Sequence, residues 1–485
     1  MLRPSASRGG GARRLGLRIN RAALVLCGMA VVLTQSAAAA ATGRQAETRT
    51  ASSWPPEPGV RFEHLSLAEG LSQSVVNSIA QDPAGFIWLA TQDGLNRFDG
   101  SELRVFKRNP EDPASLSANN ITALLVDRKG RLWVGTNGGG LDLYDPATES
   151  FTHLRHVPGD EASLNSNLIY YLVEAADGSL WVGTDQGLGH FDPATGRTRR
   201  YVYDPADPSS LGGMAVFYLH LSPQGTLWVA TYGSGLSRLD PGADRYVRYT
   251  NDPQDPGSLA DNSVQCVLGD SSGRIWVGLD GSGLDRLDPE TGSIKHFRPD
   301  EKRVGALASG DVTELLLDRS GMLWVGTSGG GLHRYDETAG SFTQSQAAPG
   351  DPQSLASNVI QSVFEDRAGV LWFGTFGAGV DRYDPHGQKF GLLRSDPERG
   401  SGLSNGQIWA ILQDRDGALW FGTNGSGLDR FDRQRGTWSN FPANPEDSDA
   451  LQASWVLSLY EDSRGDVWAG TFGGGASRYD RTTRT

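Results

Sequence analysis

One tryptophan recurs along the chain at an almost constant interval, and this period constrains the fold more than any other feature. Its nine copies are Trp88, Trp133, Trp181, Trp228, Trp276, Trp324, Trp372, Trp420 and Trp468. The intervals are 45, 48 and 47 residues, and then 48 residues five times. A fixed period of this length is typical of a repeat protein, in which each unit buries its apolar face only against its neighbours.

Each repeat predicts four short strands. The stretch DRSGMLWVGTSGGGLHRYD, residues 318–336, places an apolar run around Trp324 between two glycine-containing turns. We expect a first strand over 311–318, a second around Trp324, a third over 331–336 and a fourth around Phe342. The chain has 63 Gly and 24 Pro in 485 residues and no sustained helical period. Four antiparallel strands in about 48 residues are typical of a propeller blade, so the sequence predicts an all-β fold, a β-propeller of nine repeats.

Three positions in the repeat indicate a structural framework. The residue three before each Trp is always Gly, which predicts a turn with positive φ. The residue six before is Asp in seven repeats, where a short carboxylate can accept backbone N–H groups of the turn. The residue two after is Gly or Ala, since a larger side chain would crowd the neighbouring layer. These positions, together with the nine Trp, are interpreted as blade anchors.

A carboxylate also closes every repeat. Because a single active site needs a unique constellation, we interpret these residues as turn and capping groups and not as catalytic or metal-binding residues. They are Asp99, Asp145, Asp192, Asp240, Asp288, Asp336, Asp384, Asp432 and Asp480.

The predicted first strand contains an irregular spacing. Twelve residues before each Trp stands Val or Ile, and nine before it stands an aliphatic residue, as in Val312 and Leu315. Residues three apart do not share one face of a regular strand. A β-bulge or a bend would reconcile the two positions.

The N-terminal region has the features of an export signal. Residues 1–41 combine a basic segment, a 13-residue apolar core over 22–34 and small residues at 36–41. Thirteen residues are too few to span a bilayer, which needs roughly 20, so we expect a cleaved signal peptide and a periplasmic protein. Residues 42–59 are polar and Pro-rich, which predicts a linker.

Charge and cysteine content exclude several classes of function. The net charge is −13, and the first 50 residues hold eight Arg and one Glu, so the remaining chain is near −20. Nucleic-acid binding needs clustered Lys and Arg, and we expect none. Removal of the signal peptide would leave Cys266 as the single thiol, which excludes an internal disulfide. No Cys/His cluster has metal-ligand spacing, and we expect neither a metal nor a cofactor.

The repeat resembles the two-component regulator propeller repeat, with its pattern of Asp, Gly, aliphatic-Trp-aliphatic-Gly-Thr, Gly-Gly-Leu and aromatic-Asp. The resemblance covers about residues 60–480 and includes the opening FEHLSLAEGLSQSVVNSIAQDPAGFIWLATQDGLNRFDG and loops of the DPASLSANNI type. It implies the extracytoplasmic sensor region of a membrane-bound regulator. In that family fourteen repeats build two seven-bladed propellers, followed by a β-sandwich, a transmembrane helix and a cytoplasmic histidine kinase or diguanylate cyclase. The sequence printed here ends at Thr485, just past the third strand of its ninth repeat, so we expect a fragment or a truncated product without an output domain.

The sequence leaves the closure of the ring open. Residues 61–65 read as an isolated fourth strand that precedes the first repeat. It could complete the seventh blade, giving a propeller over residues 60–394 and the start of a second one over 395–485, where residues 389–394 would be the equivalent isolated strand. It could instead complete the ninth blade of a single nine-bladed ring. Because single propellers typically have four to eight blades, we favour seven plus two.

Candidate ligand-binding residues come from a variable position in the constant framework. The residue four after each Trp varies in a turn that shares one face with the loops between repeats, and such variation is typical both of a binding face and of an unconstrained turn. Tyr170, Phe217, Trp409 and Trp455 add aromatic groups suited to sugar stacking or to packing between blades. The predicted ligand-binding residues are Asn137, Asp185, Tyr232, Asp280, Phe376, Asn424, Phe472 and Trp409.

These features favour a non-enzymatic sensor that binds a small molecule or an oligosaccharide and signals through a membrane partner or a self-dimer. A propeller hydrolase or lyase and a periplasmic interaction scaffold are the alternatives. The repeats differ from the sialidase Asp box, in which Asp stands five residues before Trp, whereas here it stands six before. No blade carries a distinct set of Arg, Glu and Tyr of the kind that glycoside hydrolysis requires.

Overall fold

The computed structural model describes residues 60–386 apart from 241, 244 and 301, residue 395, and residues 402–481 apart from 434 and 436. Within this part of the chain the strands form nine antiparallel sheets, eight of four strands and one of three. A single turn of 3-10 helix, η2 (Leu67–Glu69), precedes the first repeat. The all-β fold and the propeller blades predicted from the sequence are confirmed.

The first seven sheets follow one order, from the innermost strand outward. The first strands are β2 (Val76–Gln81), β6 (Ile121–Val126), β10 (Ile169–Glu174), β14 (Val216–Leu221), β18 (Val264–Gly269), β22 (Val312–Leu317) and β26 (Ile360–Glu365). The second strands are β3 (Ile87–Thr91), β7 (Leu132–Thr136), β11 (Leu180–Thr184), β15 (Leu227–Thr231), β19 (Ile275–Leu279), β23 (Leu323–Thr327) and β27 (Leu371–Thr375). The third strands are β4 (Gly94–Phe98), β8 (Leu141–Asp145), β12 (Gly187–Asp192), β16 (Gly235–Leu239), β20 (Leu284–Leu287), β24 (Leu332–Asp336) and β28 (Val380–Tyr383). The fourth strands are β5 (Leu103–Phe106), β9 (Ser150–Leu154), β13 (Arg197–Tyr201), β17 (Tyr246–Tyr249), β21 (Ile294–Phe297), β25 (Ser341–Ser345) and β1 (Glu63–Leu65).

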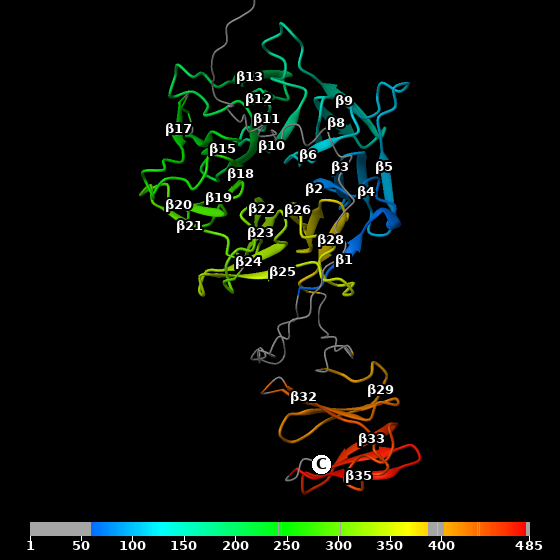
Figure 1. Cartoon of the computed structure of the whole chain (residues 1–485). Coiled ribbons are helices and arrows are strands. Elements are labelled where there is room, and N and C mark those ends of the chain that lie inside the picture. Colours follow the sequence, from blue (N-terminus) through cyan, green and yellow to red (C-terminus); the bar gives the residue numbers. More distant parts are fainter. Residues whose placement is uncertain are drawn as a thin grey trace, which may run out of the picture. The chain divides into compact units, whose positions relative to one another are not determined.

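The seven sheets close into a ring. The first strands pack side by side from β2 through β26, and β26 packs in turn against β2 (Figure 1). The N-terminal strand β1 is the fourth strand of blade seven, where Leu65 pairs with Val380 and Glu63 with Arg382. The nine-bladed alternative is therefore wrong, because the strand that would complete blade nine already completes blade seven. Residues 389–394, the signal peptide, the linker and the boundary at 394 lie outside the described residues.

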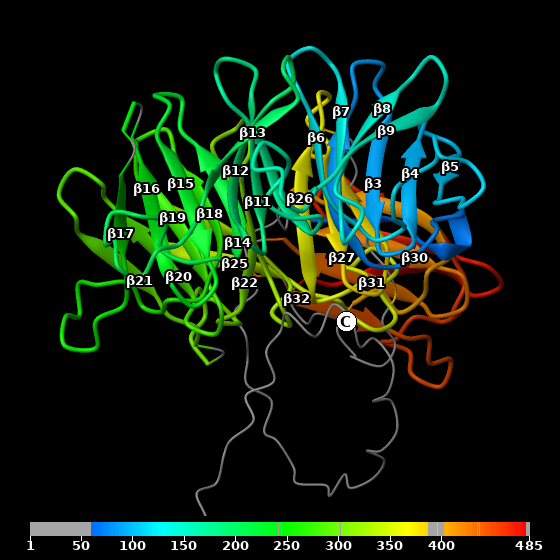
Figure 2. The ribbon, with the colours of Figure 1, turned by 90° about the horizontal axis from the view of Figure 1, so that it is seen from above.

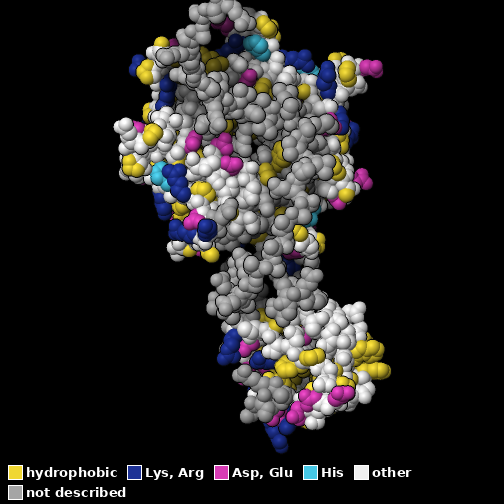
Figure 3. Space-filling model, in the orientation of Figure 1, with side chains coloured by type: hydrophobic (Ala, Val, Ile, Leu, Met, Phe, Trp, Pro, Cys, Tyr) yellow, Lys and Arg dark blue, Asp and Glu magenta, His cyan; other side chains and the backbone are white. Residues whose placement is uncertain are grey.

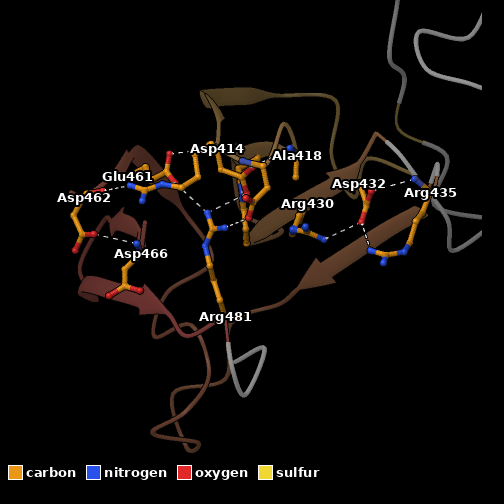
Figure 4. Close-up of polar contacts among 12 residues, drawn as sticks. Asp414, Ala418, Arg430, Asp432, Arg435, Glu461, Asp462, Asp466 and Arg481 are labelled. Atoms are coloured by element: carbon orange, nitrogen blue, oxygen red, sulfur yellow. Dashed lines mark hydrogen bonds and ion pairs between the residues drawn. The ribbon is translucent and has the colours of Figure 1, made fainter. Parts of the chain in front are cut away.

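Two further sheets follow the ring in the sequence. Blade eight comprises β29 (Ile408–Gln413), β30 (Leu419–Thr423), β31 (Leu428–Asp432) and β32 (Thr437–Phe441). Blade nine comprises β33 (Val456–Glu461), β34 (Val467–Thr471) and β35 (Gly475–Tyr479). Ion pairs join these two blades, since Arg415 contacts Glu461 at 2.9 Å and Arg481 lies 3.4 Å from Asp414. Within blade nine, Arg481 also lies 3.0 Å from Glu461 (Figure 4).

The repeated Trp lies between neighbouring blades. The Trp324 ring is 6.0 Å from that of Tyr383 in the next blade, and the Trp420 ring is 4.8 Å from that of Tyr479. Eight of the nine Trp are at most 8% exposed, whereas Trp468 of blade nine is 37% exposed. Trp468 differs because no tenth blade covers it within the described residues.

The Asp six residues before Trp binds the indole as well as the turn. In blade one, Oδ1 of Asp82 accepts the backbone N–H groups of Gly85 and Phe86, and Oδ2 accepts the indole N–H of Trp88 at 2.8 Å. The indole bond occurs in all seven repeats that have this Asp, at 2.8–3.0 Å. The backbone bonds were expected from the sequence, and the indole bond was not.

Backbone geometry confirms the other framework predictions. The Gly three residues before each Trp has a positive φ in all nine repeats, from 79° to 101°. A Cβ on Gly326, two after Trp324, would lie 2.9 Å from Cγ2 of Ile360 in the next blade. The register of the first two strands also shifts in every blade, as between Val312 and Glu314, so a β-bulge explains the spacing of three.

Candidate ligand-binding face

The turns between second and third strands share one face of the ring with the loops that lead from one blade to the next. Backbone hydrogen bonds join the two sets, as where Gly138 donates to the carbonyl of Asn167 at 2.9 Å and Gly187 to that of Met214 at 2.7 Å. Figure 2 shows the strands of the ring running between two sets of loops. The predicted ligand-binding residues of the ring therefore lie on one face.

Buried Asp–His pairs hold the inter-blade loops of this face in three blades. Asp142 accepts the backbone N–H of Ser117 at 2.8 Å, and its other oxygen lies 2.7 Å from Nδ1 of His153. Nε2 of His153 lies 3.0 Å from the carbonyl oxygen of Pro113 in the same loop. Burial raises the pKa of the Asp142 carboxyl. Because Asp285–His296 and Asp381–His64 repeat the arrangement, it positions loops and is not a catalytic dyad.

Two adjacent hollows lie on this face at blades two and three. The first, of about 530 Å³, is lined by Asn137 and by residues 117–120. The second, of about 630 Å³, is lined by Asp185 and by residues 165–168. Gly138 and Asn167 border both hollows, so they form neighbouring parts of one surface.

Aromatic side chains gather on blades three and four, next to a carboxylate of blade five. The Tyr170 ring is 4.7 Å from that of Phe217, which is 5.3 Å from that of Tyr232. The Tyr232 hydroxyl donates to Oδ2 of Asp280 at 3.2 Å. Three predicted aromatic groups and one predicted carboxylate are thus brought together. Phe376 of blade seven is exposed and its backbone N–H donates to the carbonyl of Val359.

The other predicted residues lie in blades eight and nine. The Asn424 backbone N–H donates to the Gln407 carbonyl at 3.0 Å, and that of Phe472 to the Trp455 carbonyl at 2.8 Å. The Trp455 and Phe472 rings lie 5.5 Å apart, and both side chains are exposed, as is that of Trp409. Figure 3 shows hydrophobic side chains at the surface of these two blades. The predicted set therefore divides between two parts of the chain.

The sequence reasoning missed the residues that flank the first hollow. Arg108 and Arg155 line it together with Asn119 and Asn167. Both arginines follow fourth strands, so a comparison of repeats that is anchored on Trp does not single them out. Alignment on the ends of the fourth strands would have found them.

A partly buried carboxylic acid, Glu314, also lies among the innermost strands. The Tyr218 hydroxyl of β14 donates to Oε1 of Glu314 of β22 at 2.5 Å, across the position of Cys266 on β18. The Tyr171 ring lies 3.9 Å from the ring of Tyr218. Burial raises the pKa of Glu314 to about 8. Among the described residues no group of three or more His, Cys, Asp and Glu is placed to hold a metal ion.

Comparison with known proteins agrees with the blade structure. Seven segments match the model of the two component regulator propeller, namely residues 70–93, 115–138, 163–186, 258–281, 354–377, 402–425 and 450–473. These segments run from the end of an inter-blade loop to the turn after the second strand. They are two-component regulator propeller repeats, and the resemblance expected from the sequence is confirmed.

Similar solved structures are extracellular domains of signalling proteins. One is assigned to a hybrid two component system, BT3049, of B. thetaiotaomicron, with 25% identity, a TM-score of 0.72 and coverage of 87% of this chain and 54% of that one. Another, of BT4673 from the same organism, has 23% identity, a TM-score of 0.54, and coverage of 88% and 52%, and shows the fold alone. The chain thus spans about half the length of these domains.

A curated relative is histidine kinase P4 of Formosa agariphila. It is 46% identical over 56 residues, which are 12% of this chain and 4% of that protein. Within the described residues no helix is long and apolar enough to cross a membrane.

Proposed function

We propose that this chain is the extracytoplasmic sensor region of a membrane-bound signalling regulator, and that its propeller face binds a small molecule or an oligosaccharide. The observation that carries the proposal is the likeness of 87% of the chain to the extracellular domain of a hybrid two component system, at 25% identity and a TM-score of 0.72. The short match to a histidine kinase agrees with it. Occupancy would then be transmitted to a membrane partner or a self-dimer, and the protein would be periplasmic and without catalytic activity of its own.

The chemistry of the face supports a polar, ring-shaped ligand. Along blades two to five, the amide and carboxylate groups of Asn137, Asp185 and Asp280 lie on either side of the aromatic rings of Phe217 and Tyr232. Saccharides are bound by such combinations, since hydroxyl groups need hydrogen-bond partners and the apolar faces of sugar rings pack on aromatic rings.

A thermal-shift screen of the chain against oligosaccharides and small metabolites tests this function. A ligand that binds only the folded protein stabilises it and so raises its melting temperature. At a ligand concentration 100 times the dissociation constant, the free energy of unfolding increases by about 2.7 kcal/mol. We expect a saturable increase with one compound class. Tyr232→Ala should weaken binding of that compound at nearly unchanged stability, because the Tyr232 ring packs mainly on Phe217 at the surface.

Phe376→Ala is the companion variant on the opposite part of the ring. Equal affinity of both variants and of the unmodified protein would exclude this face as the binding site. The absence of any shift across the panel would contradict ligand sensing and favour the interaction scaffold.

A further inference from the structure

Two arginine side chains flank the hollow at blade two, and neither forms an ion pair or a side-chain hydrogen bond within the described part of the chain. Arg108 follows β5 of blade one, and Arg155 follows β9 of blade two. Both side chains are exposed. The chain beyond the first 50 residues is strongly acidic. Two unpaired guanidinium groups at one hollow therefore make this part of the surface positive, in contrast to the chain as a whole.

Equivalent positions in the other blades of the ring lack this pair of charges. The residue after the fourth strand is Lys107, Arg155, Val202, Thr250, Arg298, Gln346 or Ser66, and the next one is Arg108, His156, Tyr203, Asn251, Pro299, Ala347 or Leu67. Each of the two hollows is lined by the residue directly after the fourth strand of its own blade and by the residue two after the fourth strand of the preceding blade. Blade two is therefore the one blade of the ring in which both are basic.

The other basic residues in this set have partners. Lys107 forms an ion pair with Asp93 at 2.6 Å, and Arg298 donates to the carbonyl of Ser282 at 3.2 Å. Arg108 and Arg155 thus remain available for an anion.

Two of the residues that line the hollow have polar atoms without partners. Oγ of Ser117 and Oδ1 of Asn120 are buried and have no hydrogen-bond partner among the described residues, and Ser117 is only 8% exposed. Burying a polar atom without a hydrogen bond is costly, so a bound hydroxyl group that reached these atoms would relieve this cost. The ten residues that line it include no Asp or Glu.

We propose that this hollow is the binding site for an anionic group of an oligosaccharide, held between Arg108 and Arg155 while sugar hydroxyls contact Ser117, Asn120 and Asn137. The planar guanidinium group matches carboxylate and sulfate geometry with two parallel hydrogen bonds. The second hollow, which shares Gly138 and Asn167 with the first, accommodates a neighbouring sugar unit. This inference rests on the proposed function and specifies that the oligosaccharide ligand is anionic.

Calorimetric titration with matched oligosaccharides tests the inference. The probes are uronate oligosaccharides, their neutral methyl esters, sulfated oligosaccharides and neutral ones of the same length. We expect an acidic probe to bind more tightly than its neutral counterpart, and to weaken when the salt concentration rises because the arginines are exposed. The two acidic classes separate carboxylate from sulfate recognition.

Substitutions of the two arginines test whether the anionic group binds between them. Arg108→Gln and Arg155→Gln should each reduce the affinity for the acidic probe about tenfold or more, as expected for loss of hydrogen bonds to a charged group. Arg298→Gln removes the equivalent arginine of blade five and should leave the affinity unchanged. The melting temperatures of all three variants should match that of the unmodified protein, because these side chains are exposed.

The two proposals fail in different ways. Binding of neutral probes alone, or acidic binding that is insensitive to both substitutions, would overturn the anion site and leave the sensor function standing. If no probe of either charge binds, both the anion site and saccharide sensing on this face are rejected.

Discussion

Replacement of Glu314 by Gln should stabilise the ring at neutral and alkaline pH. The pKa of Glu314 is raised from 4.5 to about 8 by burial among the innermost strands, which corresponds to about 5 kcal/mol at about 1.4 kcal/mol per pKa unit. The side chain is only partly buried, so water screens part of this cost, and we expect about 2–3 kcal/mol. Glutamine can still accept the hydrogen bond from the Tyr218 hydroxyl.

The effect has a defined pH window. Below about pH 4.5 the carboxyl is protonated in the folded and unfolded states, so the variant and the unmodified protein should be equally stable. Between about 4.5 and 8 the unfolded chain loses the proton that the folded chain retains, so the unmodified protein loses stability with rising pH and the variant does not. Above about pH 8 the difference should stay constant.

Unfolding midpoints measured in urea from about pH 3 to pH 9, a range that includes the region below the ordinary glutamate pKa, provide the assay. Glu337→Gln is the matched control, because a hydrogen bond from Arg274 lowers the pKa of this exposed carboxyl, so any trend with pH should have the opposite sign. The same pH dependence for Glu314→Gln and for the unmodified protein would refute the burial argument.

Three further predictions concern the framework. Trp324→Ala should destabilise the ring by about 3–5 kcal/mol in calorimetry, whereas Trp468→Ala should cost less because Trp468 is partly exposed; equal losses would contradict the inter-blade role. Gly326→Val should destabilise by about 1–3 kcal/mol because its Cβ would meet Ile360, and an unchanged melting temperature would show that the blades can move apart. Deletion of residues 1–65 should lower the melting temperature and increase protease cleavage near Val380, the partner of Leu65; unaltered resistance would show that β1 does not hold the ring closed.

The repeat allowed most of the blade to be predicted from the sequence. A nine-fold period identifies positions such as Gly321 and Trp324 because all copies share one local geometry, and local geometry follows from local sequence. The bulge was likewise readable from the spacing of Val312 and Leu315. The bond from Asp318 to the indole N–H of Trp324 was missed because the sequence does not show that the turn brings the carboxylate to the indole.

Contacts between distant blades could not be predicted. The partner of residues 61–65 was ambiguous because every third strand offers a similar edge, and only the pairing of Leu65 with Val380 settles it. Tyr218 and Glu314 lie 96 residues apart in blades that are not neighbours. The strand between them carries the small Cys266 at the equivalent position, and no repeat pattern encodes the contact. Arg108 and Arg155 were overlooked for a related reason. They come from two successive repeats, and a comparison of single repeats does not show that they line one hollow.

The pairing of β1 with β28 sets the order in which the chain can assemble. The two strands are joined by contacts such as that between Glu63 and Arg382, 319 residues apart, and a contact of such long range forms slowly. Six blades are each complete within a short stretch of chain, while β1 has no partner until residue 383 has been synthesised. The first strand of the ring to be synthesised is thus the last to be paired, and the ring of a nascent chain stays open until its two ends meet in one final step.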